Sequence, residues 1–135
     1  MKLMYFVEWD AFNPSGVLRK VRAQYAEWVA VGADVIMVIL SPKRKSDGVA
    51  LIDLPGCTVV DYPAGGLGKL RKAMALSKVK EIVKKFGPDI IYYRQSSWTP
   101  GLMGVFECVP KLVIEVNSDD MAETSARGFF SGTIY

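Results

Sequence analysis

The chain has 135 residues, half of them hydrophobic, and a formal net charge of +3. A chain of this length can bury one core and no second one. No apolar stretch is long enough to span a bilayer, and the N-terminus lacks a signal peptide's basic start and cleavage site, so we expect a cytoplasmic protein. With no histidine and two cysteines at no metal-binding spacing, we expect neither a metal nor a cofactor.

The positive charge is unevenly distributed. Residues 1–88 hold 14 Lys and Arg against 8 Asp and Glu, whereas residues 89–135 hold 3 against 6. The excess is concentrated between Lys69 and Lys85. A basic face of this kind often only keeps a protein soluble, but it can also hold the protein against anionic lipid or phosphate. The charge balance alone leaves both interpretations open.

The first forty residues predict a strand, a loop, a helix and a second strand. Lys2–Val7 and Asp34–Leu40 are unbroken apolar runs, and Val17–Val31 between them has helical periodicity and ends at Gly32. Continuously apolar strands are buried on both faces, which is typical of a parallel sheet covered by helices. In such a βαβ unit the loop before the helix lies at the carboxyl edge of the sheet, where open α/β folds bind ligands.

The rest of the chain continues this alternation. A helical period runs from Leu67 to Phe86 and stops at Gly87-Pro88, and a second helix is expected over Trp98–Glu107 with Pro100 in its first turn. Val49–Leu54 is ambiguous between a short strand and a loop. We therefore predict an α/β fold, a doubly wound, Rossmann-like parallel sheet with helices on both faces and the first strand at its centre. The expected strands are Lys2–Val7, Val35–Leu40, Thr58–Tyr62, Asp89–Tyr93 and Lys111–Val116.

Three segments together resemble the N-terminal half of a family 4, GT-B-type glycosyltransferase. Residues 13–40 are similar to the family's first βαβ unit, in which a Gly-rich loop leads into the helix. Residues 87–103 (GPDIIYYRQSSWTPGLM) resemble the fourth strand and the following loop, and residues 111–123 (KLVIEVNSDDMAE) resemble the fifth strand. The order and spacing of these segments carry the resemblance, which extends from Lys2 to about Glu123.

The resemblance implies that residues 1–135 are one Rossmann-like half of a GT-B fold, the acceptor-side domain, truncated and without the donor-binding half. No closing helix is predicted after the last strand, which also hints at a fragment. The implied activity of the parent enzyme is retaining transfer of a sugar from a nucleotide-sugar donor to a polysaccharide or glycolipid acceptor. We expect the chain alone to be inactive, and we expect no nucleic-acid partner.

The loop before the first helix supplies the first candidate binding residues, Ser15, Gly16 and Arg19. The N–H groups at a helix N-terminus carry partial positive charge and favour an anion. A cation in the first turn, such as Arg19, is unfavourable unless a negative group lies nearby, and a donor pyrophosphate or a phosphorylated acceptor would supply one. The alternative is a tight turn at Gly16 with the cations in water. Where the family has paired glycines, this chain has Ser15-Gly16.

The other candidates follow the fourth and fifth strands. Arg94 could grip a phosphate or carboxylate through two hydrogen bonds, or it could form an ordinary salt bridge with Glu115 or Asp119. Gln95 and Asn117 could bind sugar hydroxyls, which need both donors and acceptors. Many members of the family have a histidine after one of these strands, whereas here the positions hold Arg94 and Asn117. Glu8 and Asp10, after the first strand, could be acidic groups at the acceptor but are more commonly solvated loop carboxylates.

The basic segment from Lys69 to Lys85 predicts a core face opposite a solvated face, with one exception. Three apolar side chains fall on its charged side, which suits a helix lying on the surface of an anionic membrane leaflet. A peripheral contact with the inner face of the membrane is therefore a further expectation. The apolar residues are Leu67, Leu70 and Met74, and their basic neighbours are Lys69, Arg71 and Lys78.

A stand-alone flavodoxin-like or receiver-like regulatory domain is the alternative function. A receiver requires a carboxylate cluster after the first strand, an Asp ending the third strand and a Lys ending the fifth. The chain has Glu8 and Asp10, then Asp61 inside the third strand, and Asn117 in place of the lysine. A dinucleotide-binding domain requires G-x-G-x-x-G after its first strand, and P-S-G-V-L-R does not match it.

Overall fold

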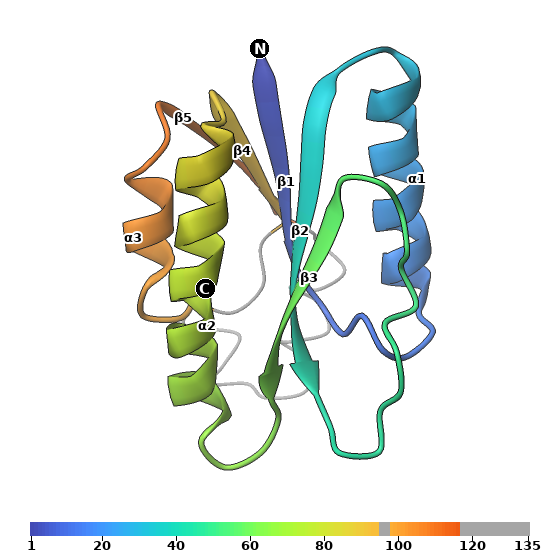
Figure 1. Ribbon diagram of the computed structural model, residues 1–135, viewed down its shortest axis with the longest axis vertical. Coiled ribbons are helices and arrows are strands. Elements are labelled where there is room, and N and C mark those ends of the chain that lie inside the picture. The colour runs from blue at the N-terminus through green and yellow to red at the C-terminus, as the bar shows by residue number, and fades with distance from the viewer. Residues whose placement is uncertain (95–97, 117–135) are drawn as a thin grey trace.

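The computed structural model describes residues 1–94 and 98–116. Its five strands form one all-parallel sheet in the order β3-β2-β1-β4-β5, with β1 at the centre as predicted. Helix α1 covers one face, and α2 and α3 cover the other (Figure 1). The doubly wound, Rossmann-like fold is therefore confirmed. The elements are β1 (Lys2–Glu8), α1 (Gly16–Ala30), β2 (Asp34–Lys43), β3 (Cys57–Pro63), α2 (Gly68–Phe86), β4 (Ile90–Arg94), α3 (Leu102–Phe106) and β5 (Lys111–Glu115).

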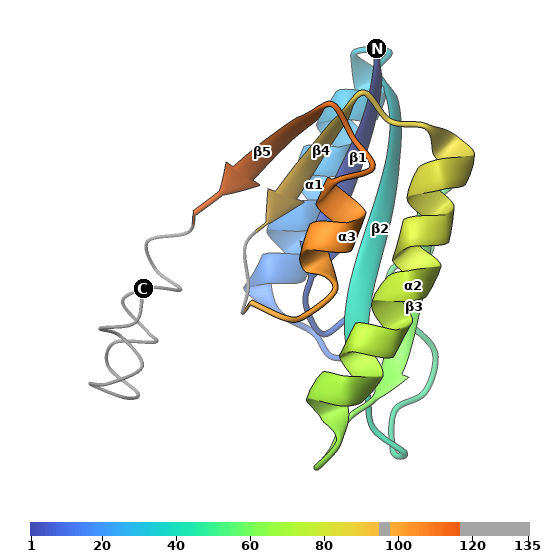
Figure 2. The ribbon, with the colours of Figure 1, turned by 90° about the vertical axis from the view of Figure 1, so that its left-hand side faces the viewer.

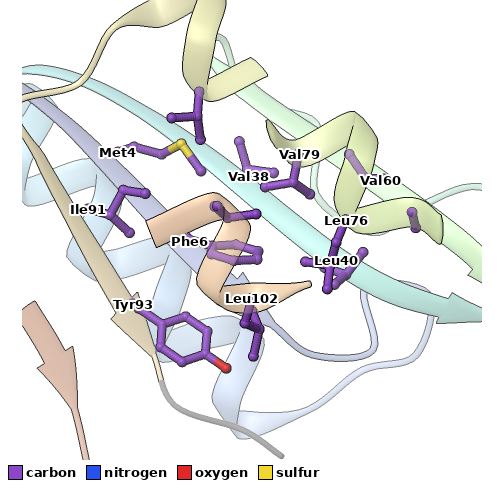
Figure 3. Packing of buried hydrophobic residues seen from close by; sticks show 13 residues of the cluster. Met4, Phe6, Val38, Leu40, Val60, Leu76, Val79, Ile91, Tyr93 and Leu102 are labelled. Atoms are coloured by element: carbon purple, nitrogen blue, oxygen red, sulfur yellow. The ribbon is translucent and has the colours of Figure 1, made fainter. Parts of the chain in front are cut away.

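Alternation along the central strand divides the interior of this one domain into two apolar layers, which form the core beneath α1 and the core beneath α2 and α3. Met4 and Phe6 belong to the core beneath α2 and α3 (Figure 3), whereas Tyr5 and Val7 belong to the core beneath α1. All four side chains are 2% exposed or less. Because successive strand residues point to opposite faces, a strand buried on both sides must be apolar at every position. This requirement explains the unbroken apolar run at the start of the chain.

Glycines end the two long helices as the sequence predicts. Gly32 has φ +82 directly after the C-cap of α1, and Gly87 has φ +66 at the C-cap of α2. Both angles lie in the left-handed region, which glycine enters without steric cost. At the other end of α1, Ser15 is an extended N-cap whose side chain accepts a hydrogen bond from the Leu18 N–H.

One helix begins later than expected, and the segment that was ambiguous in the sequence is a loop. Helix α3 begins at Leu102, not at Trp98, because Gly101 has φ +101 and keeps Pro100 outside the helix. The ambiguous residues 49–54 form no strand. They belong to the loop between β2 and β3, which packs Ile52 into the core beneath α1 and is held there by the Tyr25 hydroxyl, a donor to the Pro55 carbonyl at 2.8 Å.

The edge strand β5 is not covered by the described residues (Figure 2). Leu112, Val113 and Ile114 are 37%, 44% and 47% exposed. Because neighbouring residues of a strand face opposite sides, the exposure affects both faces of β5. Among the described residues, no helix is both long and apolar enough to cross a membrane.

Candidate functional site

The strand order reverses its direction between β1 and β4, which makes this the topological switch point of the sheet. From β1 the sheet grows through β2 to β3 in one direction, and β4 and β5 lie in the other. In open α/β sheets, ligands bind outside the carboxyl ends of the strands at such a switch point. The last residues of the two flanking strands are Glu8 and Arg94, and they are only 5% and 4% exposed.

Glu8 is held by two side chains from other elements. Its Oε2 lies 2.6 Å from Nζ of Lys72 on α2, and its Oε1 accepts a hydrogen bond from the Tyr93 hydroxyl of β4 at 3.2 Å. Burial raises the pKa of the Glu8 carboxyl, while the Lys72 charge and the hydrogen bonds from Lys72 and Tyr93 act in the opposite direction. The expectation of a solvated loop carboxylate is therefore wrong for Glu8, because α2 covers it.

Arg94 projects from the opposite face of the sheet. It is paired in register with Val7, whose side chain lies in the core beneath α1, whereas Glu8 is the next residue along β1 and faces α2. Nη1 of Arg94 lies 3.3 Å from Oε1 of Glu115, its neighbour on β5. The ion pair with Glu115, one of the two alternatives left open by the sequence, is thus present.

The Arg94–Glu115 pair also affects the tyrosine beside it. Burial raises the pKa of Tyr5 to about 12, the Glu115 charge adds to the increase, and the Arg94 charge opposes it. Tyr5 stacks on Tyr92 with ring centroids 5.7 Å apart and meets Trp28 of α1 edge-on at 5.0 Å. An aromatic layer thus lies next to Arg94 on the α1 face of the sheet.

Both acceptor positions of the Ser15 hydroxyl are occupied by hydrogen bonds within the protein. Its Oγ accepts from the Leu18 N–H at 3.1 Å and from the Trp9 indole N–H at 3.0 Å. A hydroxyl has two lone pairs and one proton, so only the proton remains for a ligand, and it suits an anionic acceptor. The same loop is tied to its neighbours, because Ala11 N–H donates to the Ser41 hydroxyl at 2.9 Å and Ala11 O accepts from Leu51 N–H at 2.8 Å.

A cavity of about 250 Å³ opens beside the start of α1. Arg19 and Arg22 line it from one side of the helix, and Leu51 and Ile52 line it from the β2–β3 loop. The remaining lining residues, Pro14, Ser15 and Leu18, include no acid. Two cations one helical turn apart beside an apolar wall fit a small molecule with an anionic group and an apolar part.

Gly16 is the first residue of α1, and neither its conformation nor its packing requires a glycine. Its φ is not positive, and an added Cβ would meet no heavy atom within 4 Å. The absence of a side chain instead leaves open space at the helix N-terminus. Of the residues predicted for the site, Ser15, Gly16 and Arg19 lie together, and Arg94 lies at the end of β4 on the same sheet edge. Gln95 and Asn117 fall outside the described residues.

Lys72 and Tyr93 contact Glu8 but were not among the residues predicted for the site. A signal for Lys72 was available, because it precedes Ala75, Leu76 and Val79 by three, four and seven residues and so falls on the buried face of α2. A lysine at a core position requires an acidic partner, and Glu8 ends an otherwise apolar strand. Tyr93 gave no such signal, since a tyrosine in a buried strand is ordinary.

Comparisons with known proteins add no assignment to this geometry. No protein-family model matches the sequence, and no curated protein matches it.

Proposed function

We propose that this chain is the acceptor-side domain of a nucleotide-sugar-dependent, retaining glycosyltransferase of the GT-B type, acting on a polysaccharide or glycolipid acceptor. The observation that carries the proposal is the strand order 3-2-1-4-5, which leaves polar and cationic side chains from β1, β4 and the start of α1 along one carboxyl edge. The resemblance of residues 13–40, 87–103 and 111–123 to the family supports the same function.

The strand order also weighs against the alternative. Flavodoxin-like and receiver-like domains have the order 2-1-3-4-5, in which the first strand is not the middle one. A dinucleotide-binding domain shares the order found here but uses a Gly-rich turn to approach the pyrophosphate closely. In this chain the corresponding turn is capped by Ser15, whose hydroxyl already accepts two hydrogen bonds.

The exposed edge strand fits a domain that belongs to a larger fold. Leu112, Val113 and Ile114 have the composition of a buried strand, yet they are each more than one-third exposed. In the proposal, further polypeptide of the same enzyme covers them and supplies the half that binds the nucleotide sugar. The acceptor and donor then meet across a cleft between the two halves.

The chemistry assigned to this half is binding and charge stabilisation. Arg19, Arg22 and the free N–H groups at the start of α1 would face an anionic group, either a phosphorylated acceptor or the leaving diphosphate. Cations and helix N-termini that are already in place stabilise the charge that develops on a leaving group. Arg94, buried and paired with Glu115, would instead position the adjacent strand ends.

The test is a fusion of this chain to the donor-binding half that the proposal requires, assayed for sugar transfer from nucleotide sugars to glycan and lipid-linked acceptors. Arg19→Gln combined with Arg22→Gln should lower kcat/KM by about 10- to 100-fold, as expected for lost hydrogen bonds to a charged group. Lys20→Gln with Lys45→Gln is the matched control, because it also removes two charges from exposed positions and neither residue lines the cavity.

Two results would contradict the proposal. The first is a folded fusion that transfers no sugar from any nucleotide sugar tested, and the second is turnover by the 135-residue chain alone. Equal activity of the double arginine variant and the double lysine control would remove the assignment of the cavity while leaving the reaction class in place.

A further inference from the structure

Helix α2 exposes large apolar side chains and buries a cation. Leu67, directly before the helix, and Leu70 and Met74 within it are 63%, 60% and 66% exposed. Lys72, between them in sequence, is 7% exposed. At this end of the helix the arrangement is the reverse of the usual pattern, in which apolar residues face the core and lysines face water.

Contacts with the sheet determine how α2 is rotated about its own axis. The ion pair between Lys72 and Glu8 and the packing of Leu76 and Val79 turn one side of α2 toward the sheet. At 100° per residue, positions 70 and 74 then lie on the opposite side, next to position 67. The three apolar side chains therefore form one outward patch, which we call the α2 crest (Leu67, Leu70 and Met74). No contact within the described core uses these residues.

Cations surround the α2 crest. The sole acid of α2 is Glu81, which lies nearly two turns beyond Met74. The exposed basic residues near the crest are Lys69, Arg71 and Lys78, whereas the exposed Lys84 and Lys85 lie further along α2 than Glu81. Apolar side chains framed by lysine and arginine match the acyl and headgroup layers of an anionic leaflet, because the stems of the cations can stay in apolar surroundings while their charges meet phosphate.

We propose that the α2 crest docks on an anionic bilayer surface, with Leu67, Leu70 and Met74 in the acyl boundary and the flanking cations on the headgroups. A protein partner fits less well, since protein interfaces are depleted in lysine. Helix α2 follows β3 and so begins at the carboxyl edge of the sheet (Figure 1), and docking there brings that edge to the membrane. The docking itself does not depend on the proposed sugar transfer.

The experiment is co-sedimentation of the 135-residue protein with phospholipid vesicles. Vesicles with about one-third phosphatidylglycerol should bind the protein, whereas pure phosphatidylcholine vesicles should bind it far less, and added salt should release it. Leu70→Gln with Met74→Gln should lower the partition coefficient by about tenfold or more, because apolar area no longer enters the lipid. Val31→Gln with Val49→Gln is the control, since these residues are 81% and 86% exposed elsewhere on the surface, and it should bind as the wild type does.

A second pair of variants tests the charges. Arg71→Gln with Lys78→Gln should also lower binding by about tenfold or more, whereas Lys20→Gln with Lys45→Gln removes the same charge from other exposed positions and should have a smaller effect. Circular dichroism and thermal unfolding establish that each variant is folded. Equal binding by crest and control variants overturns the proposal, as does the absence of binding to anionic vesicles. Dimerisation that is lost in Leu70→Gln with Met74→Gln, without vesicle binding, would assign the crest to self-association and overturn it as well.

Discussion

Replacing Lys72 with methionine tests the buried ion pair most directly. Methionine has similar length and no charge, so the variant leaves the Glu8 carboxylate, 4% exposed in its side chain, without its counter-ion. Removing one partner of a buried pair costs about 3–5 kcal/mol of the free energy of unfolding. Glu8 can limit this cost by taking up a proton. From an ordinary value of 4.5, protonation of the carboxyl costs about 3.4 kcal/mol at pH 7 and about 0.7 kcal/mol at pH 5.

The pH dependence of the loss has a defined sign. Burial already raises the pKa of Glu8, and removal of Lys72 takes away an opposing influence, so the pKa rises further in the folded variant. A group whose pKa is higher in the folded state stabilises the folded protein at pH values below its unfolded-state pKa. This stabilisation is lost as the pH rises through its folded-state pKa. Lys72→Met should therefore be close to the wild type at pH 5 and about 3 kcal/mol less stable at pH 7.

Urea unfolding at pH 5 and pH 7, with equal m-values for the two proteins, measures this difference. The double variant Glu8→Gln with Lys72→Met serves as the control. It removes both charges and leaves an amide for the Tyr93 hydroxyl, so it should recover most of the loss. A loss below about 1 kcal/mol for Lys72→Met, equal at both pH values, would show that water reaches the Glu8 carboxylate and would refute the reasoning.

Three further predictions concern stability. Gly56→Ala places a methyl group against the Tyr25 hydroxyl at a residue with φ +79. Gly87→Ala has a similar φ of +66 but open space, and should lower the free energy of unfolding by roughly 1–2 kcal/mol. Gly56→Ala should lower it by more, and thermal melts of the two variants compare the losses. Burial raises the pKa of Tyr5 to about 12, so the stability that its neutral phenol contributes is present below pH 10 and is lost between pH 10 and 12. Tyr5→Phe should abolish the last step of an absorbance titration of the phenols. Leu76→Ala, at a side chain 2% exposed, should cost about 2–5 kcal/mol in urea unfolding, and a loss below that range would indicate a loose core beneath α2.

The sequence predicted the fold well because a parallel sheet leaves strong local signals. All five strands lie within a few residues of the expected ranges. The signal is strongest in β1 and β2, which need a continuous apolar run because they are buried on both faces. The ends of the long helices were predictable for the same kind of reason, because Gly32 and Gly87 end them in the left-handed region. The start of α3 was not, since Pro100 permits a helix start while Gly101 takes a conformation that delays it.

The candidate site was less predictable because its contacts join residues far apart in the chain. Glu8 lies 85 residues from Tyr93, and its burial depends on how α2 packs. An acid at the end of a strand has the same local pattern whether it meets water or a lysine, so the sequence alone favoured the commoner case. Ser15 was found by its position before a helix, but the second hydrogen bond that it accepts, from Trp9, follows from the fold of the loop.

The burial of Arg94 changes what an alanine substitution at this position can test. As an exposed residue, it could be replaced by alanine at a cost within about 0.5 kcal/mol, and any loss of transfer would then indicate a role in binding. In the structure it is 4% exposed and paired with Glu115, so Arg94→Ala removes buried volume and leaves an acid without this partner. Reduced transfer by that variant would follow from either a binding role or a loosened strand edge. Arg94→Lys keeps the charge but not the planar fork, so turnover per folded molecule in that variant separates the two explanations, whereas the exposed Arg19 can be judged from activity alone.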